Sequence, residues 1–236
     1  MITAPKSPRK TYWRQMFAFT GGAFLFWLLQ FALQYWRLSS GDLPGSLIRA
    51  SSFAGATLIG AALFSSAIFK WFPQTARYWR YRRYLGVSGV VFVSFHAFAV
   101  YYYYYGFNLS AVYYSLNPVE NPVVFGSLAL PFFLLMALTS TDWALQKLGG
   151  RNWKTLHRFV YIAYPLSIFH FLLIRPEVLA TAPGILLLTV TALAVFGQIF
   201  WFFKIAGAKR FRSLGSLVGF AIIIVTLVIA YLIFGM

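Results

Sequence analysis

Three histidines are the residues of this chain best suited to chemistry, because all three lie in apolar segments long enough to cross a membrane. They are His96, His157 and His170, and the 236-residue sequence has no others. An ionisable side chain in hydrocarbon is costly, so it usually faces the interior of a helix bundle, has a partner there and marks a functional site. Neutral imidazole is also a good ligand for iron. These side chains are therefore the main candidates for a metal or cofactor site.

The remaining composition restricts the chemistry and indicates a membrane protein. The chain has no cysteine, which excludes disulfides, iron–sulfur clusters and thiolate ligation of haem by this chain. Hydrophobic residues make up 60% of the sequence and charged residues 10%, whereas about 25% of a soluble domain is charged. The four acidic residues all lie between apolar runs: Asp42, Glu120, Asp142 and Glu177.

Apolar stretches of about 20 residues recur along the chain, and each can span a hydrocarbon core of about 30 Å. The runs are continuous rather than alternating with period two, which favours helices over a barrel. We therefore expect an all-α membrane protein, a bundle of about seven transmembrane helices in a single domain over residues 16–236 that follows a basic tail at 1–15. The expected spans are residues 16–36, 48–69, 85–105, 122–140, 155–174, 183–203 and 215–235.

The basic residues are distributed unevenly around these spans. Of 20 lysines and arginines, all but Arg37, Arg49 and Arg175 lie in the N-terminal tail or beside the second, fourth and sixth connections. The positive-inside rule then puts the N-terminus in the cytoplasm and, with seven spans, the C-terminus outside. The formal charge of +16 is therefore interpreted as membrane topology, with lipid as the neighbour and no nucleic acid.

The expected depths of the histidines favour one pair. At 1.5 Å per residue, His96 lies about 17–20 Å from the cytoplasmic boundary, His170 about 24 Å and His157 about 5 Å. A haem between two helices needs its axial imidazoles at similar depth, so His96 and His170 are the better pair. His157 and His170 on one helix would suit two haems stacked across the membrane, but their side chains would point about 140° apart. Pro165 lies between them and can kink the helix.

Other interpretations of these residues stay open. A histidine in a membrane helix can simply bond a carbonyl across the bundle, which fits His157 best because it lies near headgroup level. Basic residues near the helix ends could contact haem propionates or only lipid headgroups. Those beside an inner haem would be Arg82, Arg83, Arg151 and Arg158, and the one beside an outer haem would be Arg175.

Tyrosines gather at the expected outer end of the third span. They are Tyr101 to Tyr105, Tyr113 and Tyr114. An aromatic belt at the membrane interface is the preferred interpretation, and an electron relay is the alternative.

Two runs of residues resemble a known family. Arg82-Arg83-Tyr84-Leu85-Gly86, followed ten residues later by His96, resembles the third span of the ferric-reductase-like transmembrane domain. The run Leu138-Thr139-Ser140-Thr141-Asp142, then Trp153 to Tyr161 with His157 inside it, and finally His170, is similar to the next two helices of that domain. The resemblance is strongest to the MsrQ branch, whose members are haem-binding membrane partners of a periplasmic methionine sulfoxide reductase. It covers about residues 80–175, the expected haem-binding core.

The resemblance implies a six-helix core with one additional span, and one or two b-type haems held by His96, His157 and His170. It also implies electron transfer across a bacterial inner membrane. Related oxidases and ferric reductases carry two histidines fourteen residues apart on the third helix, and Arg82 stands at the second of those positions here. An inner haem at His157 would then have one histidine ligand or a different second ligand, or would be absent.

Members of this family usually receive electrons from NADPH and FAD bound by a C-terminal cytoplasmic domain, and the sequence shows no motif of such a domain. The chain ends at Met236 after an apolar span and has no glycine-rich dinucleotide fingerprint. We therefore expect the electron-transfer subunit of an oxidoreductase system, with a separate flavin reductase or membrane quinol as donor and FMN or quinone as further candidate cofactors. The acceptor would be a periplasmic oxidoreductase partner or ferric iron.

Two functions from other classes remain as alternatives. One is a transporter or channel with a polar histidine site, and the other is a scaffold protein whose histidines are structural. No acid lies within an expected span and no inverted repeat is apparent, which disfavours a transporter.

Overall fold

Long helices form almost all of the computed structural model, which describes the backbone of residues 9–206 and the side chains of residues 15–177 and 180–201. No strand occurs in this part of the chain, so the predicted all-α membrane fold is confirmed. The elements are α1 (Arg9–Leu33), η1 (Gln34–Leu38), α2 (Leu43–Trp71), η2 (Pro73–Tyr78), α3 (Trp79–Tyr103), α4 (Leu109–Val112), α5 (Val123–Leu138), α6 (Asp142–His157), α7 (Val160–Ile174), η3 (Pro176–Ala180) and α8 (Ala182–Ala206).

Six of the seven expected spans correspond to described helices, namely α1, α2, α3, α5, α7 and α8. Five stretches of the described residues are long and apolar enough to cross a membrane, and α5 is a shorter apolar helix. The chain is therefore an integral membrane protein. The expected seventh span at 215–235, the position of the C-terminus and most of the basic tail lie outside the described residues.

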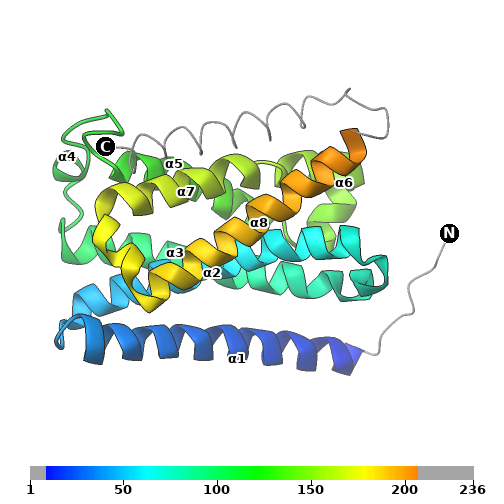
Figure 1. Cartoon of the computed structure of the whole chain (residues 1–236), viewed down its shortest axis with the longest axis horizontal. Helices are drawn as coiled ribbons and strands as arrows, with labels where there is room; N and C mark the ends of the chain where they lie inside the picture. The colour runs from blue at the N-terminus through cyan, green and yellow to red at the C-terminus, as the bar shows by residue number, and fades with distance from the viewer. Residues whose placement is uncertain (1–8, 207–236) are drawn as a thin grey trace.

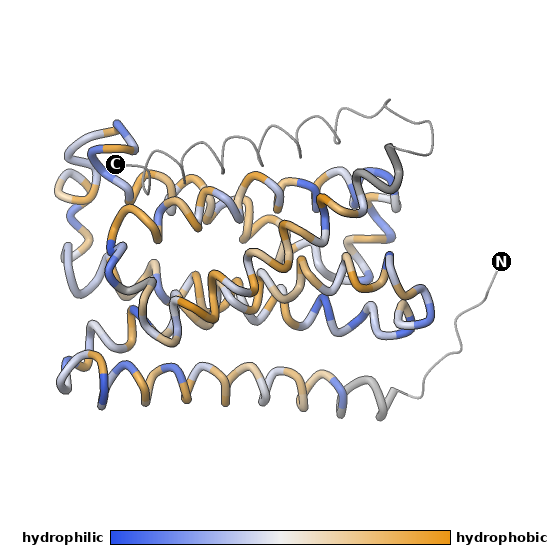
Figure 2. Tube along the Cα trace, viewed as in Figure 1, coloured by the Kyte–Doolittle hydropathy of each residue, from blue (hydrophilic) through white to orange (hydrophobic). Residues whose placement is uncertain are grey.

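The helices lie roughly side by side along the long axis of the molecule, and α8 crosses them obliquely (Figure 1). The segment that contains α4 lies at one end of the bundle, and α6 lies at the other. Hydrophobic residues line the middle of the helices, whereas hydrophilic residues gather at the two ends (Figure 2). This distribution is the one expected when the helices cross a bilayer.

Small residues bring α2 and α3 into close contact. A Cβ atom added at Gly55 would lie 2.8 Å from the carbonyl oxygen of Gly89, and one added at Gly89 would lie 2.8 Å from the carbonyl oxygen of Gly55. The two backbones therefore touch at a position where any larger residue would collide, as is typical of membrane helix pairs. Asp42 begins α2 by accepting a hydrogen bond from the amide of Gly45 at 3.1 Å, which satisfies one of the free amides of the first turn.

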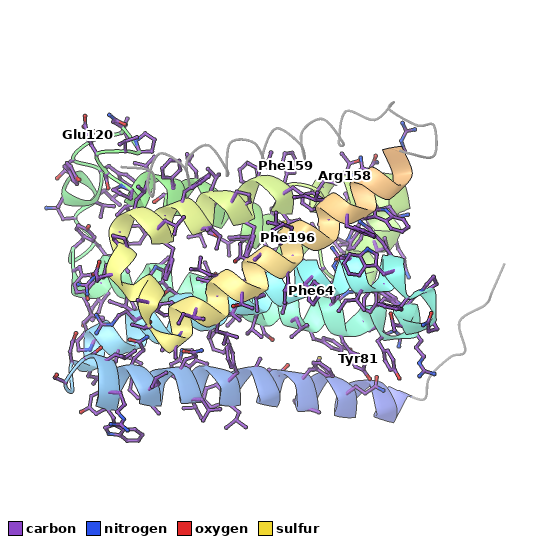
Figure 3. The ribbon with its side chains drawn as sticks, in the orientation of Figure 1. Phe64, Tyr81, Glu120, Arg158, Phe159 and Phe196 are labelled. Carbon is purple, nitrogen blue, oxygen red and sulfur yellow. The ribbon has the colours of Figure 1, made fainter. Side chains whose placement is uncertain are left out.

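Aromatic and hydroxyl side chains join the other helices to this pair. Phe53 of α2 packs edge-to-face on Phe171 of α7, with ring centroids 4.9 Å apart. On the opposite side of α2, the indole of Trp27 donates to the hydroxyl of Ser51 at 2.9 Å. Tyr81 lies between α3 and α1 in Figure 3, where it stacks on Phe19. The helices that carry His96 and His170, α3 and α7, are thus both packed against α2.

The expected span at 155–174 is wrong as a single helix. It is divided between α6, which ends at His157, and α7, which begins at Val160. His157 and His170 therefore do not share one helix, and the expected 140° angle between them does not apply. α6 is a partly polar helix. At its start, the hydroxyl of Thr141 accepts a hydrogen bond from the amide of Ala144. It bends at Gly149, whose φ of 72° favours glycine.

Candidate functional site

The structure brings His96 of α3 and His170 of α7 together. Their ring centroids lie 6.2 Å apart, and their planes are inclined by 69°. The two side chains come from helices that are far apart in the sequence, so this contact depends on the packing of both helices around α2. It is the pair that the depth argument favoured.

Each ring of this pair is held by a backbone carbonyl. Nδ1 of His96 lies 3.0 Å from the carbonyl oxygen of Ile48, and Nδ1 of His170 lies 2.9 Å from that of Pro122. A carbonyl oxygen can only accept, so each Nδ1 carries the proton and donates it. In a neutral imidazole this assignment leaves Nε2 with its lone pair, ready to bind a metal.

Both carbonyls belong to the starts of helices at the end of the bundle where α4 lies (Figure 1). Ile48 lies early in α2, and Pro122 immediately precedes α5. The Pro122 oxygen also accepts a hydrogen bond from the amide of Phe125 at 3.1 Å. The hydrogen-bond partners of both imidazoles are therefore set by where these two helices begin.

Gly126 provides the room for the His170 ring. A Cβ atom added at Gly126 would lie 3.1 Å from Cγ and from Nδ1 of His170, and 3.2 Å from Cε1. Any side chain at this position would press on the ring. The absence of one on α5 therefore allows the imidazole to lie against the helix and to reach the Pro122 carbonyl.

The geometry of the pair fits two axial ligands of one haem iron. Metal–imidazole bonds are about 2 Å long, so two imidazoles on opposite sides of one ion have centroids roughly 6 Å apart. An edge-to-face contact between two rings has a similar separation, about 4.5–7 Å. The hydrogen bonds favour the first interpretation, because both Nδ1 atoms donate to carbonyls and no described residue bonds either Nε2 atom. Within the described residues, no group of three or more His, Cys, Asp or Glu side chains could hold a metal ion.

His157 lies in a different setting from the other two histidines. It is the last residue of α6, and its ring stacks on Trp153 with centroids 3.9 Å apart and planes inclined by 26°. Its Nε2 is 3.3 Å from the hydroxyl of Thr139. The indole of Trp153 donates to the Thr139 carbonyl at 2.9 Å. These contacts tie the end of α6 to the end of α5, and they agree with a structural role for His157 as well as with a ligand role.

A cavity of about 140 Å³ lies beside His157. Its lining includes the guanidinium-bearing side chains of Arg82 and Arg83, and neither His96 nor His170 takes part in it. The full lining is Ile59, Ala62, Leu63, Phe69, Trp79, Arg82, Arg83, Gly86, Val87, Val90, Phe133, Met136, Ala137, Ser140, Trp153, His157 and Val160. The structure thus separates a cationic, aromatic cavity from the histidine pair.

Arg83 is held at this cavity by two interactions. Its Nη1 lies 2.6 Å from Oδ1 of Asp142, and its guanidinium lies over the Trp79 ring, 5.4 Å from the centroid. Its Nη2 is buried and has no hydrogen-bond partner among the described residues. This remaining donor could bind an anionic group in the cavity.

The other three predicted arginines lie elsewhere. Arg151, Arg158 and Arg175 are exposed, and none of them lines the cavity. Arg158 is in the turn between α6 and α7 (Figure 3), and Arg175 follows the last residue of α7. The structure does not bring these side chains to the histidine pair.

The tyrosines at the end of α3 divide into two groups. Tyr102, Tyr103, Tyr104 and Tyr114 are exposed, as an interfacial aromatic belt would be. Tyr101 and Tyr113 instead bond each other through their hydroxyls at 2.8 Å. Both also reach the hydroxyl of Ser127 in α5, at 3.2 and 2.9 Å.

Sequence reasoning missed the residues that surround the histidines. The Ile48 and Pro122 carbonyls are backbone atoms, which no pattern of side chains reveals. Trp153 belongs to the motif around His157, and its four-residue spacing from His157 also predicts a contact on one helix face. Gly126 carried no signal apart from being a glycine in an apolar span.

Comparison with known proteins places these residues in a family. The family described as "Ferric reductase like transmembrane component" matches residues 51–168, which is half of the chain. This range includes His96 and His157 and ends two residues before His170. None of the solved structures matches the chain.

Curated relatives match over a shorter stretch. The "Protein-methionine-sulfoxide reductase heme-binding subunit MsrQ" of Brucella ovis, Brucella canis and Brucella suis is 42% identical to this chain over 69 residues. The matched stretch covers 29% of this chain and 30% of each relative.

Proposed function

The chain belongs to the family of ferric-reductase-like transmembrane components, and from this premise we propose that it is a haem-binding membrane protein that transfers electrons. The observation that carries the proposal is the His96/His170 pair, whose Nδ1 atoms both donate to carbonyls while both Nε2 atoms remain available. The name of the MsrQ relatives as haem-binding subunits supports it. The haem would be of the b type, as the resemblance to the family implies, and the absence of cysteine agrees with a haem that is not covalently attached.

The residues of this chain would hold and tune the cofactor. His96 and His170 would bind the iron from opposite sides, and the Ile48 and Pro122 carbonyls would fix the orientation of the two rings and increase their basicity. A haem with two imidazole ligands supplies a one-electron carrier without an open position for oxygen chemistry. The packing of α3 and α7 against α2 would keep the pair in place during turnover.

The cavity beside His157 would bind the cofactor or quinone on the side of the protein where electrons enter. Arg82 and Arg83 give it positive charge, and Trp79 and Trp153 give it flat apolar walls. A second haem, FMN or a quinone headgroup could bind such a surface, with His157 as the single histidine near it. For a second haem, the propionates would meet the arginines of the cavity rather than Arg158 or Arg175, which are exposed.

The electron donor and the electron acceptor would act at opposite faces of the membrane. We place the α6 end of the bundle in the cytoplasm, because the basic residues gather there. The bacterial source of the MsrQ relatives supports a bacterial inner membrane as the location. Electrons would come from a cytoplasmic flavin reductase or from membrane quinol. They would leave to a periplasmic oxidoreductase partner, as for an MsrQ-like subunit, or to ferric iron.

Absorption spectroscopy of the purified protein in detergent tests the proposal. A reduced-minus-oxidised difference spectrum with the α-band of a b-type haem supports it. A protein that stays colourless after expression with ample haem precursor contradicts it, and leaves the transporter and scaffold functions.

Haem stoichiometry in single variants tests the assignment of the ligands. We expect His96→Ala and His170→Ala to lose the same haem. Ser94→Ala is a matched control on α3, because the Ser94 hydroxyl bonds only the Val90 carbonyl of its own helix, and it should keep its haem. If the two histidine variants lose different haems, the pairing is wrong.

A further inference from the structure

The segment between α3 and α5 forms part of the surface at one end of the helix bundle (Figure 1). This segment, residues 104–121, contains α4 and is called the α4 segment below. It carries exposed apolar side chains at Leu109, Leu116 and Val119, which are 63%, 76% and 73% exposed. Glu120 in the same segment lies at the very end of the bundle (Figure 3). The α4 segment is therefore part of the surface at this end of the protein.

One buried side chain ties the α4 segment to α5. Asn121 is 1% exposed, and its Nδ2 donates to the carbonyls of Val112 at 2.8 Å and of Ser115 at 3.0 Å. Its Oδ1 accepts from the amide of Val123 in the first turn of α5 at 3.3 Å. The amide group is therefore bonded to the α4 segment by its nitrogen and to α5 by its oxygen.

Pro122 lies in the sequence between Asn121 and Val123, the two residues joined by the last of these bonds. Its carbonyl is the acceptor for Nδ1 of His170 at 2.9 Å. A second tie lies nearby, because the hydroxyl of Tyr113 donates to Ser127 at 2.9 Å, next to the Gly126 that makes room for the His170 ring. The α4 segment is thus bonded to α5 at Val123, which follows Pro122, and at Ser127, which follows Gly126.

We infer that Asn121 is a positioning residue, which couples the α4 segment to the haem ligand His170 through the Pro122 carbonyl. The inference rests on the proposed function, because it requires a haem at the His96/His170 pair. The bond from Nδ1 to a carbonyl increases electron donation from the imidazole and so favours ferric iron. A shift of the α4 segment would therefore change the reduction potential of the haem.

The test compares Asn121→Ala with Asn117→Ala by redox titration of the purified haem protein. Asn117 is an exposed residue of the same segment whose side chain bonds only within it, so it is a matched control. Losing the Asn121 bonds should weaken the bond to His170 and raise the midpoint potential. A tenfold change in the ratio of ferric to ferrous haem at a fixed potential is the expected size, which corresponds to about 59 mV for one electron. The ferric EPR signal should shift as well, and Asn117→Ala should change neither.

Two further variants keep the test decisive if Asn121→Ala does not fold. Asn121→Asp keeps the acceptor for Val123 but loses both donors to the α4 segment, and Tyr113→Phe removes the second tie to Ser127. Both should raise the potential. In haem-free protein, amide hydrogen exchange in residues 109–116 and in the first turn of α5 should increase together in Asn121→Ala.

The outcomes separate this inference from the proposed function. A colourless wild-type protein would overturn both. A wild type with haem, together with variants whose potential and EPR signal are unchanged while exchange in the α4 segment increases, would overturn the coupling alone.

Discussion

Gly126→Ala should weaken haem binding at the His96/His170 pair, because the ring of His170 occupies the space that the new methyl group needs. The added Cβ would lie 3.1 Å from Cγ and Nδ1 of the ring. Since the optimal separation of non-bonded carbon atoms is about 3.5–4.0 Å, the ring has to move by roughly 0.5 Å. That movement acts directly on the hydrogen bond to Pro122 and on the direction of Nε2.

The size of the effect follows from this displacement. Overpacking of this kind costs about 1–3 kcal/mol, and every 1.4 kcal/mol is about tenfold in affinity. Binding sites also need their groups within about 0.5 Å of the productive position. We therefore expect haem affinity to fall roughly 5- to 140-fold, while the bundle still folds.

Titration of haem into the haem-free protein, followed by absorbance, measures this change. Gly22→Ala is the matched control, because a Cβ atom at Gly22 of α1 meets nothing within 4 Å. It should stabilise its helix by up to about 1 kcal/mol and leave haem affinity unchanged. A Gly126→Ala protein that binds haem within about twofold of the wild type, with the same spectrum, would refute the role of Gly126.

Three further changes test other parts of the structure. Gly55→Ala should lower the free energy of unfolding by about 1–3 kcal/mol or more, because its Cβ would press on the backbone of α3; unchanged stability in a denaturation series in detergent would contradict the close contact. Asp142→Asn should cost less than about 1 kcal/mol, since Asp142 is largely exposed beside Arg83, and the difference in Tm should shrink at high salt. His157→Ala should keep the spectrum of the His96/His170 haem and lower only the content of a second haem; loss of that spectrum would show that His157 is one of the pair's ligands.

The positions of the membrane helices were largely predictable from the sequence. Continuous apolar runs predict helices such as α2 and α8, because a bilayer demands both the length and the composition. The sequence did not predict α6 because this helix is partly polar, so no apolar run indicates it. The division between α6 and α7 lies at the polar start of the expected span at 155–174, and the turn at Arg158 contains no proline or glycine that would predict it.

The histidine pair was predictable for a physical reason, and its surroundings were not. Helix rise alone puts His96 and His170 at similar depths, and the structure brings the two rings together. Their hydrogen-bond partners are carbonyls of Ile48 and Pro122, whose identity depends on where α2 and α5 begin. The buried bonds of Asn121 likewise depend on the path of the α4 segment, which only the folded structure defines.

Anomalous scattering at the iron absorption edge, from crystals of the haem-loaded protein, tests the central claim most directly. We predict an iron peak between Nε2 of His96 and Nε2 of His170, with both Nδ1 atoms still bonded to the carbonyls of Ile48 and Pro122. An iron peak at another place, or two imidazoles packed directly against each other with no iron between them, would contradict the account.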